Sequence, residues 1–178
     1  MINGKAVVYE IKTALDNFDR LDGQLSDYYK AFSRVVVVTS ESNYAEIQKR
    51  LIDSPVGICI LTSRGTLSIR KEPEEKLDDL CKSTMFKILR KEEYEHILLE
   101  LFGELPQVSQ FEYYRACKTM FDSLSNEVAY RYFIQALKKR TKIEIESYED
   151  VPYELKFLVY FSNLKKKDYS KLNKFLNA

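Results

Sequence analysis

The residues most able to do chemistry stand at the end of the first apolar run, residues 5–12. Glu10 and Lys12 are two apart, so on a β-strand their side chains share one face with Ala6 and Val8. A carboxylate at a strand end can ligate Mg²⁺ or Mn²⁺, and a nearby ammonium can hold a water or stabilise charge on a phosphate oxygen. The apolar run predicts a central strand, where an unpartnered charge pair would be costly. The alternative is a solvated strand face, because Glu-x-Lys is a common tripeptide.

A second pair of polar residues lies on the helix predicted at residues 19–33. Apolar positions such as Leu21 and Leu25 recur there at helical spacing. Gln24 and Tyr28 are four apart and therefore stand one turn apart on a single face. This helix crosses back over the strand ends, so we expect both side chains near the charge pair. For Gln24 the alternative is a plain surface amide.

The order of these motifs resembles the PD-(D/E)XK nuclease superfamily, in particular its RecB-like branch and a small bacterial and phage family within it. The resemblance covers roughly residues 5–70, under half of the chain. It is carried by Tyr9-Glu10-Ile11-Lys12, Arg20-Leu21, the Gln24-to-Tyr28 pattern and the β-branched run 35–38. It implies a mixed β-sheet of restriction-endonuclease-like type and metal-dependent hydrolysis of phosphodiester bonds in DNA.

Carried onto this sequence, the resemblance implies a role for each motif residue. Glu10 would be the metal ligand, and Lys12 would position the nucleophilic water or steady the pentavalent phosphate. Gln24, Tyr28 and Arg20 would contact the DNA backbone or orient the catalytic groups. The implied cofactor is Mg²⁺ or Mn²⁺.

One ligand that the resemblance implies is missing. Family members carry an Asp on a strand before the Glu-x-Lys strand, whereas residues 1–9 contain no acid. Three explanations stay open: the chain is a shortened version of a longer protein, the acid comes from another chain or from Asp16 or Asp53, or the protein is an inactive relative that still binds. The first and third are favoured, because a single carboxylate holds Mg²⁺ poorly.

The hydropathy pattern predicts an α/β fold with a mixed sheet in residues 1–76. The run Val35–Val38 is β-branched and short, so it predicts a strand that is parallel to the first and reached through the helical crossover. Ser63-Arg64-Gly65 predicts the turn of a hairpin. The other elements expected here are a helix at 44–52 and strands at 57–62 and 66–70.

From residue 77 to 178 the periodicity predicts an all-helical subdomain, with the Pro73-containing segment 71–76 as the joint. Its many tyrosines fit ordinary apolar core stripes, and the alternative is stacking on bases or sugars. Helices are expected at 78–90, 92–102 with Gly103 as its stop, 109–123, 125–140, 152–162 and 168–177.

Composition excludes a strongly basic nucleic-acid module, because the net charge of the 178-residue chain is +1. Positive charge gathers only at 138–142 and 165–167, which also suits helix C-termini. The three cysteines lack the paired spacing of a disulfide framework or a zinc site, so we expect buried thiols in a reducing cytosol. No stretch approaches the roughly 18 apolar residues of a membrane span. We therefore expect a cytoplasmic protein without membrane contact.

Two functions stay open from the sequence. The leading hypothesis is a nuclease-like protein that hydrolyses DNA with a metal ion, inactive or incomplete as it stands. The alternative is a non-catalytic regulatory module of bacterial or phage origin that binds nucleic acid or protein, with the helical subdomain contacting a protein partner. The first strand has an unpaired flank, which predicts a homo-oligomer that covers this edge.

Overall fold

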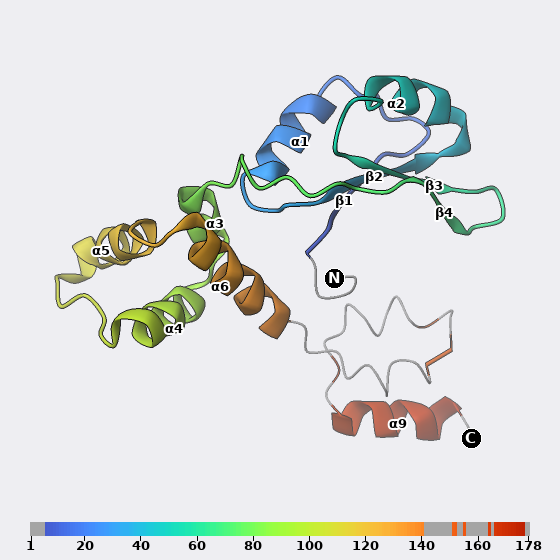
Figure 1. The fold of residues 1–178 in the computed structure, drawn as a ribbon. Coiled ribbons are helices and arrows are strands. Elements are labelled where there is room, and N and C mark those ends of the chain that lie inside the picture. The colour runs from blue at the N-terminus through green and yellow to red at the C-terminus, as the bar shows by residue number, and fades with distance from the viewer. Residues whose placement is uncertain (1–5, 141–150, 153–154, 156–163, 165, 177–178) are drawn as a thin grey trace. The chain divides into compact units, whose positions relative to one another are not determined.

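The chain divides into two compact units, Met1–Ala136 and Leu137–Ala178. The first unit holds a β-sheet with two helices and a group of further helices, and the second holds the C-terminal helix (Figure 1). The computed structural model describes residues 6–140, 151–152, 155, 164 and 166–176.

The sheet of the first unit is mixed, which confirms the predicted α/β class. Its spatial order, β1-β2-β3-β4, is also the order of the strands in the sequence. The pairs β1–β2 and β2–β3 are parallel, and β3–β4 is antiparallel. The strands are β1 (Val8–Ile11), β2 (Val35–Ser40), β3 (Gly57–Leu61) and β4 (Leu67–Lys71).

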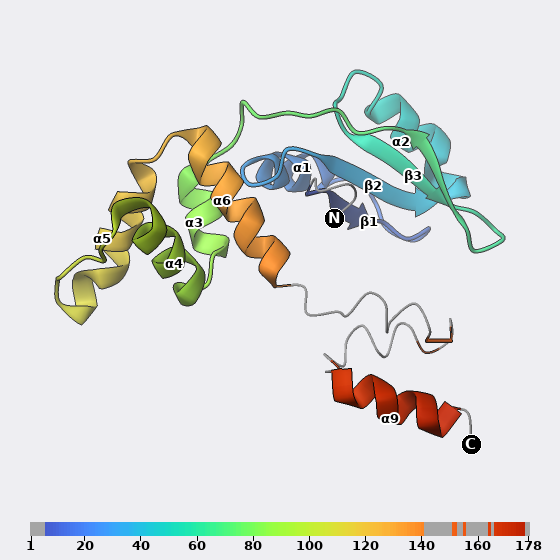
Figure 2. The same cartoon turned by 60° about the horizontal axis from the view of Figure 1, so that its bottom comes forward.

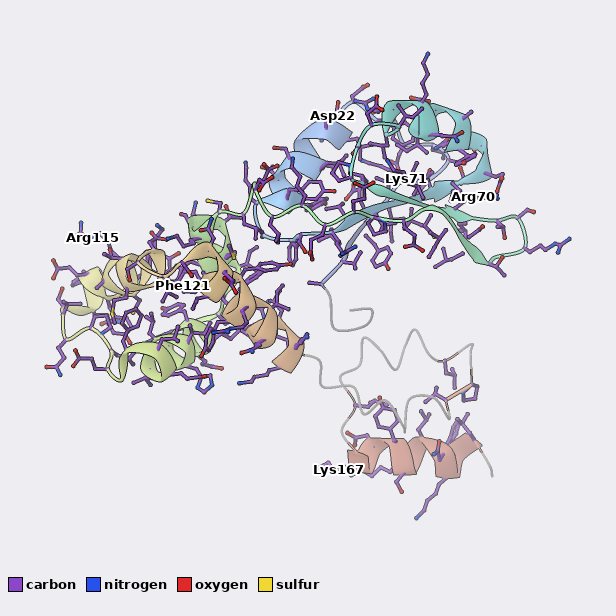
Figure 3. The ribbon with its side chains drawn as sticks, in the orientation of Figure 1. Asp22, Arg70, Lys71, Arg115, Phe121 and Lys167 are labelled. Atoms are coloured by element: carbon purple, nitrogen blue, oxygen red, sulfur yellow. The ribbon has the colours of Figure 1, made fainter. Side chains whose placement is uncertain are left out.

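Both crossover helices lie on the same side of this sheet. The helix α1 (Leu21–Tyr29) joins β1 to β2, and α2 (Tyr44–Arg50), preceded by the 3₁₀ turn η1 (Glu41–Asn43), joins β2 to β3 (Figure 1). Parallel crossovers are right-handed, so two successive crossovers that advance in one direction must cover one face. An exposed ion pair between Arg50 and Asp22, with Nη2 and Oδ2 2.8 Å apart, connects α2 to α1 (Figure 3).

The core of the sheet lies between the strands and these two helices. It forms because the first strands turn alternate apolar side chains toward the helices, while each helix contributes one apolar stripe. The buried residues are Phe18, Leu21, Leu25, Tyr29, Val35, Val37, Ile47, Leu51, Val56, Ile58 and Ile60.

The strand β1 lies at an edge of the described sheet, so its predicted central position is wrong. Its residues alternate between partly buried and exposed, and the exposed fractions are 44% for Tyr9 and 70% for Ile11. A strand with two apolar faces can be central or at an edge, so this pattern does not predict its place in the order of strands. The place of a strand in the sheet depends on the direction in which successive crossovers advance.

The predicted hairpin joins β3 to β4. Gly65 takes a left-handed conformation with φ of 74°, which a residue without Cβ adopts at little cost. The Thr62 backbone N–H donates to the Thr66 carbonyl at 2.9 Å and closes the loop. The turn signal read from residues 63–65 is therefore confirmed.

Four helices follow within the described residues 72–140, as the periodicity predicts. Gly103 ends α4 with φ of 78°, confirming its role as the helix stop. No helix in the described part of the chain is long and apolar enough to cross a membrane. The helices are α3 (Lys82–Ile88), α4 (Lys91–Phe102), α5 (Gln110–Asp122) and α6 (Asn126–Lys139).

Aromatic rings hold α3, α4 and α5 together. Phe86 and Phe121, the latter labelled in Figure 3, are fully buried with ring centroids 5.5 Å apart, and the ring centroid of Tyr94 lies 4.8 Å from that of Phe86. Tyr114 adds a ring 5.3 Å from Phe86. These rings pack together in a core, as the apolar stripes of the helices predict.

Side chains of α6 contact the connection between α1 and β2 inside the first unit. The Tyr130 hydroxyl accepts a hydrogen bond from the Ser33 backbone N–H at 3.2 Å and donates to the Ser33 hydroxyl at 2.9 Å. The rings of Phe32 and Phe133 lie 5.6 Å apart. The proposed division of the chain at residues 76 and 77 stays a prediction.

The second unit contains α9 (Lys166–Leu176), close to the helix expected at 168–177. Tyr169 and Val151 are buried together against partly buried leucines, so one face of α9 is apolar and packed. Most of the helix expected at 152–162 lies outside the described residues.

Two glycines provide a matched test of the packing in the first unit. A Cβ on Gly57 would lie 2.9 Å from Pro73 Cδ and 3.0 Å from the Lys71 carbonyl oxygen, whereas nothing lies within 4 Å of a Cβ on Gly23. We expect Gly57→Ala to lower the free energy of unfolding by about 1–3 kcal/mol. Gly23→Ala, within α1, should raise it by about 0.5–1 kcal/mol. Urea unfolding measures both, and equal effects would contradict the packing described at Gly57.

Candidate functional site

The Glu10–Lys12 pair lies at the carboxyl end of β1, on the face that the helices cover. The Glu10 Oε1 and Lys12 Nζ atoms are 3.3 Å apart, and each side chain is only 12% exposed. The Lys12 backbone N–H donates to the Val38 carbonyl at 2.8 Å, which continues the pairing of β1 with β2. The pair is therefore an ion pair removed from bulk water.

The helix α1 supplies a partner to each charge. The Tyr28 hydroxyl donates to Glu10 Oε2 at 2.6 Å, and Lys12 Nζ donates to Gln24 Oε1 at 2.8 Å. We call Glu10, Lys12, Gln24 and Tyr28 the polar quartet. The structure thus brings together four of the five predicted site residues, and their catalytic and substrate roles stay predictions.

The geometry of the quartet follows from the sequence of α1. Leu21 and Leu25 are buried in the core, which fixes the rotation of the helix about its axis. Gln24 and Tyr28 lie beside this apolar stripe, one turn apart, so both face the strand end. The burial of the two leucines therefore also places the Gln24 amide and the Tyr28 phenol beside the charge pair.

The quartet perturbs the ionisation of its phenol. The hydrogen bond to the Glu10 carboxylate, with a smaller contribution from burial, raises the pKa of Tyr28 from 10.0 to about 12. A deprotonated Tyr28 would place a second negative charge beside Glu10. Tyr28 is therefore held as a neutral donor at physiological pH.

The quartet does not fit a magnesium site. Its one carboxylate has Oε2 bonded to Tyr28 and Oε1 beside the Lys12 ammonium, whereas Mg²⁺ needs several oxygen ligands in octahedral geometry. Among the described residues, no group of three His, Cys, Asp or Glu side chains could hold a metal ion. The Asp16 carboxylate is used locally, because its Oδ2 accepts the Thr13 N–H at 2.6 Å. The expected Mg²⁺ or Mn²⁺ at Glu10 stays a prediction that this donor set disfavours.

Two further residues complete the description of the strand ends. Arg20, predicted to orient substrate, directly precedes α1 and its side chain is exposed. Asn43 was not predicted, yet its Nδ2 donates to the Thr13 carbonyl at 3.1 Å and to Thr39 Oγ1 at 3.3 Å. The polar stretch at residues 39–43, after the second strand, is the sequence signal that could have indicated Asn43.

Comparison with known proteins decides the family. The profile of the family described as Bacteriophage P4 protein cII matches residues 1–151. The chain belongs to this family. Protein cII of Enterobacteria phage P4 is 34% identical over 64 residues, a match that covers 36% of this chain and 24% of that protein. The match thus spans about a quarter of the length of this relative. No solved structure matches the chain.

Membership of the P4 protein cII family corrects the resemblance drawn from the sequence. The kinship with PD-(D/E)XK nucleases is wrong, and with it the description of the protein as a magnesium-dependent hydrolase. The motifs misled because Glu-x-Lys and Gln-x-x-x-Tyr also arise when a crossover helix satisfies a charge pair at a strand end. The second hypothesis, a non-catalytic regulatory module of phage origin, is supported better than the nuclease.

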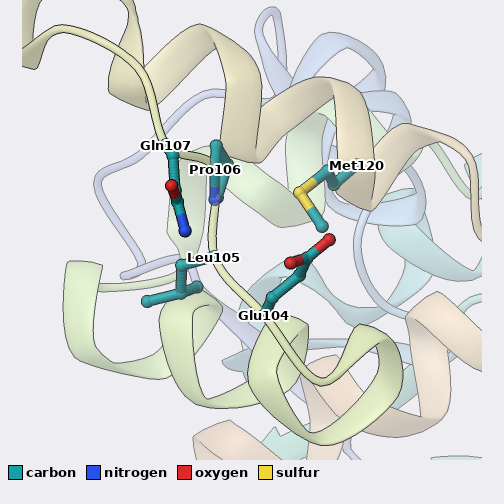
Figure 4. A pocket seen from close by; sticks show the side chains of 5 residues that line it. All are labelled: Glu104, Leu105, Pro106, Gln107 and Met120. Carbon is teal, nitrogen blue, oxygen red and sulfur yellow. The ribbon is translucent and has the colours of Figure 1, made fainter.

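A pocket elsewhere on the first unit has no link to the quartet. It is formed by the connection between α4 and α5 together with Met120, and its volume is about 340 Å³ (Figure 4). The Glu104 carboxylate points toward the Met120 thioether across it (Figure 4). The lining residues are Glu104, Leu105, Pro106, Gln107 and Met120.

The raised pKa of Tyr28 predicts a dependence of stability on pH. The unfolded chain loses this phenol proton near pH 10 and the folded protein near pH 12, so the stabilisation is complete below pH 10 and is lost between pH 10 and 12. Tyr28→Phe should lower the free energy of unfolding by about 1 kcal/mol at pH 8. The substitution should also make the free energy of unfolding fall less steeply above pH 10.

Urea unfolding of both proteins at pH 8, 10 and 11 measures this difference. Other tyrosines with a raised pKa, such as Tyr29, are present in both proteins and cancel in the comparison. Parallel pH profiles for the two proteins would contradict the hydrogen bond from Tyr28 to Glu10.

Proposed function

We propose that this member of the P4 protein cII family is a non-catalytic regulatory module that acts by binding a protein. The observation that carries the proposal is the closed polar quartet. Glu10 and Lys12 are satisfied by each other and by α1, at distances of 2.6 to 3.3 Å. Both Glu10 carboxylate oxygens are thus engaged within the protein and are not presented to a substrate.

The charges of the sheet region also favour a protein partner over DNA. Binding to the DNA backbone requires cations that are free to neutralise phosphates. Here many of the basic side chains contact a carboxylate or carbonyl oxygen of the same chain. They include Lys12, Lys30, Arg34, Arg50, Arg70, Lys71 and Lys76.

Of the two remaining basic clusters, only the one on α6 has a structural use; Lys166 and Lys167 begin α9, so the expectation that residues 165–167 suit a helix C-terminus is wrong. Lys138 and Lys139 occupy the last turn of α6, where cations interact favourably with the helix dipole. The net charge of the chain, +1, adds no long-range attraction for a polyanion. DNA, the partner expected from the nuclease resemblance, is therefore the less favoured ligand.

The proposal predicts that the chain neither cuts DNA nor binds it tightly. Supercoiled plasmid incubated with the protein and 5 mM Mg²⁺ or Mn²⁺ should stay uncut. The anisotropy of a labelled 30-base-pair duplex should show no saturation below about 10 μM protein at 150 mM salt, since even non-specific binders can reach a Kd of this order. Lys12→Met serves as the matched control in both assays.

Two outcomes would overturn the proposal. One is metal-dependent nicking that Lys12→Met abolishes, which would restore a catalytic role for the quartet. The other is saturable duplex binding that weakens steeply with salt, which would identify DNA as the partner.

A further inference from the structure

The face of the sheet opposite α1 and α2 is apolar; its margins are exposed, whereas Val36 and Cys59 in its middle are buried. It exists because both crossovers advance in one direction, so both helices lie on the other side (Figure 1). We call this surface the open face. Its residues are Tyr9, Ile11, Val36, Val38, Cys59, Leu61, Leu67 and Ile69.

The register of the strands makes the open face continuous. Ile11 is opposite Val38, Val38 is opposite Cys59, and Cys59 is opposite Ile69. Directly opposite residues project from the same side of a sheet, so these four form one apolar row across all the strands. A parallel row follows where Leu61 is opposite Leu67.

The side chains at the margins of the open face are strongly exposed. The exposed fractions are 70% for Ile11, 65% for Leu67, 59% for Ile69, 49% for Leu61 and 44% for Tyr9. Among the described residues of the first unit, no helix covers them. Together they present on the order of 500 Å² of apolar surface, which matches the largest patches found on monomers. Sheets with parallel strands are normally covered on both faces.

A bulge keeps one charge, that of Lys71, off the open face, while Glu72 lies near Tyr9 at its margin. A bulge in β4 shifts the register so that Ile69 is opposite Cys59, while Lys71 is opposite Ile58, a residue of the covered core. The Lys71 ammonium accordingly donates to the Leu51 carbonyl at 2.6 Å, at the end of α2 (Figure 3). A strand of strict alternation would have placed a lysine beside Ile69.

We propose that the open face packs against the open face of a second copy of the chain, so that two sheets form a sandwich about a two-fold axis. This inference rests on the proposed function and names its partner. Two copies would together bury on the order of 1,000 Å² of apolar surface, which is about the lower limit for a specific interface. Sheets packed in this way lie about 10 Å apart with interleaved side chains.

The chemistry of the open face selects a second copy as the partner. A mainly apolar surface is best matched by another of the same kind, and homodimer interfaces are more apolar than transient ones. Two-fold dimers are also the commonest assemblies. This contact uses side chains, and it differs from pairing through the free backbone groups of β1.

Sedimentation velocity of the full chain from 1 to 100 μM tests the proposal. We expect a dimer, and we expect Ile69→Lys to raise its dissociation constant at least tenfold, because the substitution places a charge on the apolar open face. Ile52→Lys is the matched control, since Ile52 is 70% exposed but follows α2, away from the open face. It should leave the dimer intact.

Leu67→Thr is a second variant that keeps the preference for a strand while removing apolar surface, and it should also weaken the dimer. Far-UV circular dichroism checks that each variant is folded. A monomeric wild-type chain at 100 μM, or a folded Ile69→Lys and a Leu67→Thr variant that dimerise as strongly as wild type, would overturn the proposal. A monomer that neither cuts nor binds DNA refutes only the dimer, whereas a dimer that binds DNA refutes only the proposed function.

Discussion

The carboxylate of Glu10 is the group around which the N-terminal part of the molecule is organised. It pairs with Lys12 at 3.3 Å and accepts the Tyr28 hydroxyl at 2.6 Å. These contacts attach the end of β1, a four-residue edge strand, to the helix that follows it. An ion pair only 12% exposed would be costly if either charge lacked a partner. The polar quartet therefore connects β1 to α1 through side-chain contacts, and this structural role accounts for all four side chains.

The order of the strands then determines what the molecule exposes. The sheet advances β1-β2-β3 through two parallel crossovers, so α1 and α2 cover one face and bury the core. The opposite face keeps Ile11, Leu67 and Ile69 in contact with solvent. One topological constraint thus explains both the closed polar site and the apolar surface. The closed polar site and the apolar surface are the two observations on which the proposed binding function and the proposed dimer rest.

The sequence was most informative where the pattern is local. The β-branched run at Val35 predicted β2, Gly103 predicted the end of α4, and helical spacing placed Gln24 and Tyr28 on one face. The sequence did not predict the edge position of β1, because this position depends on the topology, that is, on the direction in which the crossovers advance. The nuclease reading failed for a different reason: a buried ion pair that needs partners produces the same short motif as a metal site.

The most direct test of the account is native-state hydrogen exchange of the β1 amides in Lys12→Met. If the quartet fastens β1 to α1, loss of the ammonium should speed exchange at Glu10 by about tenfold, the equivalent of about 1.4 kcal/mol, while amides of β3 such as Ile60 stay protected. Unchanged exchange at Glu10 in the variant would show that the quartet does not hold the strand, and would contradict the central claim.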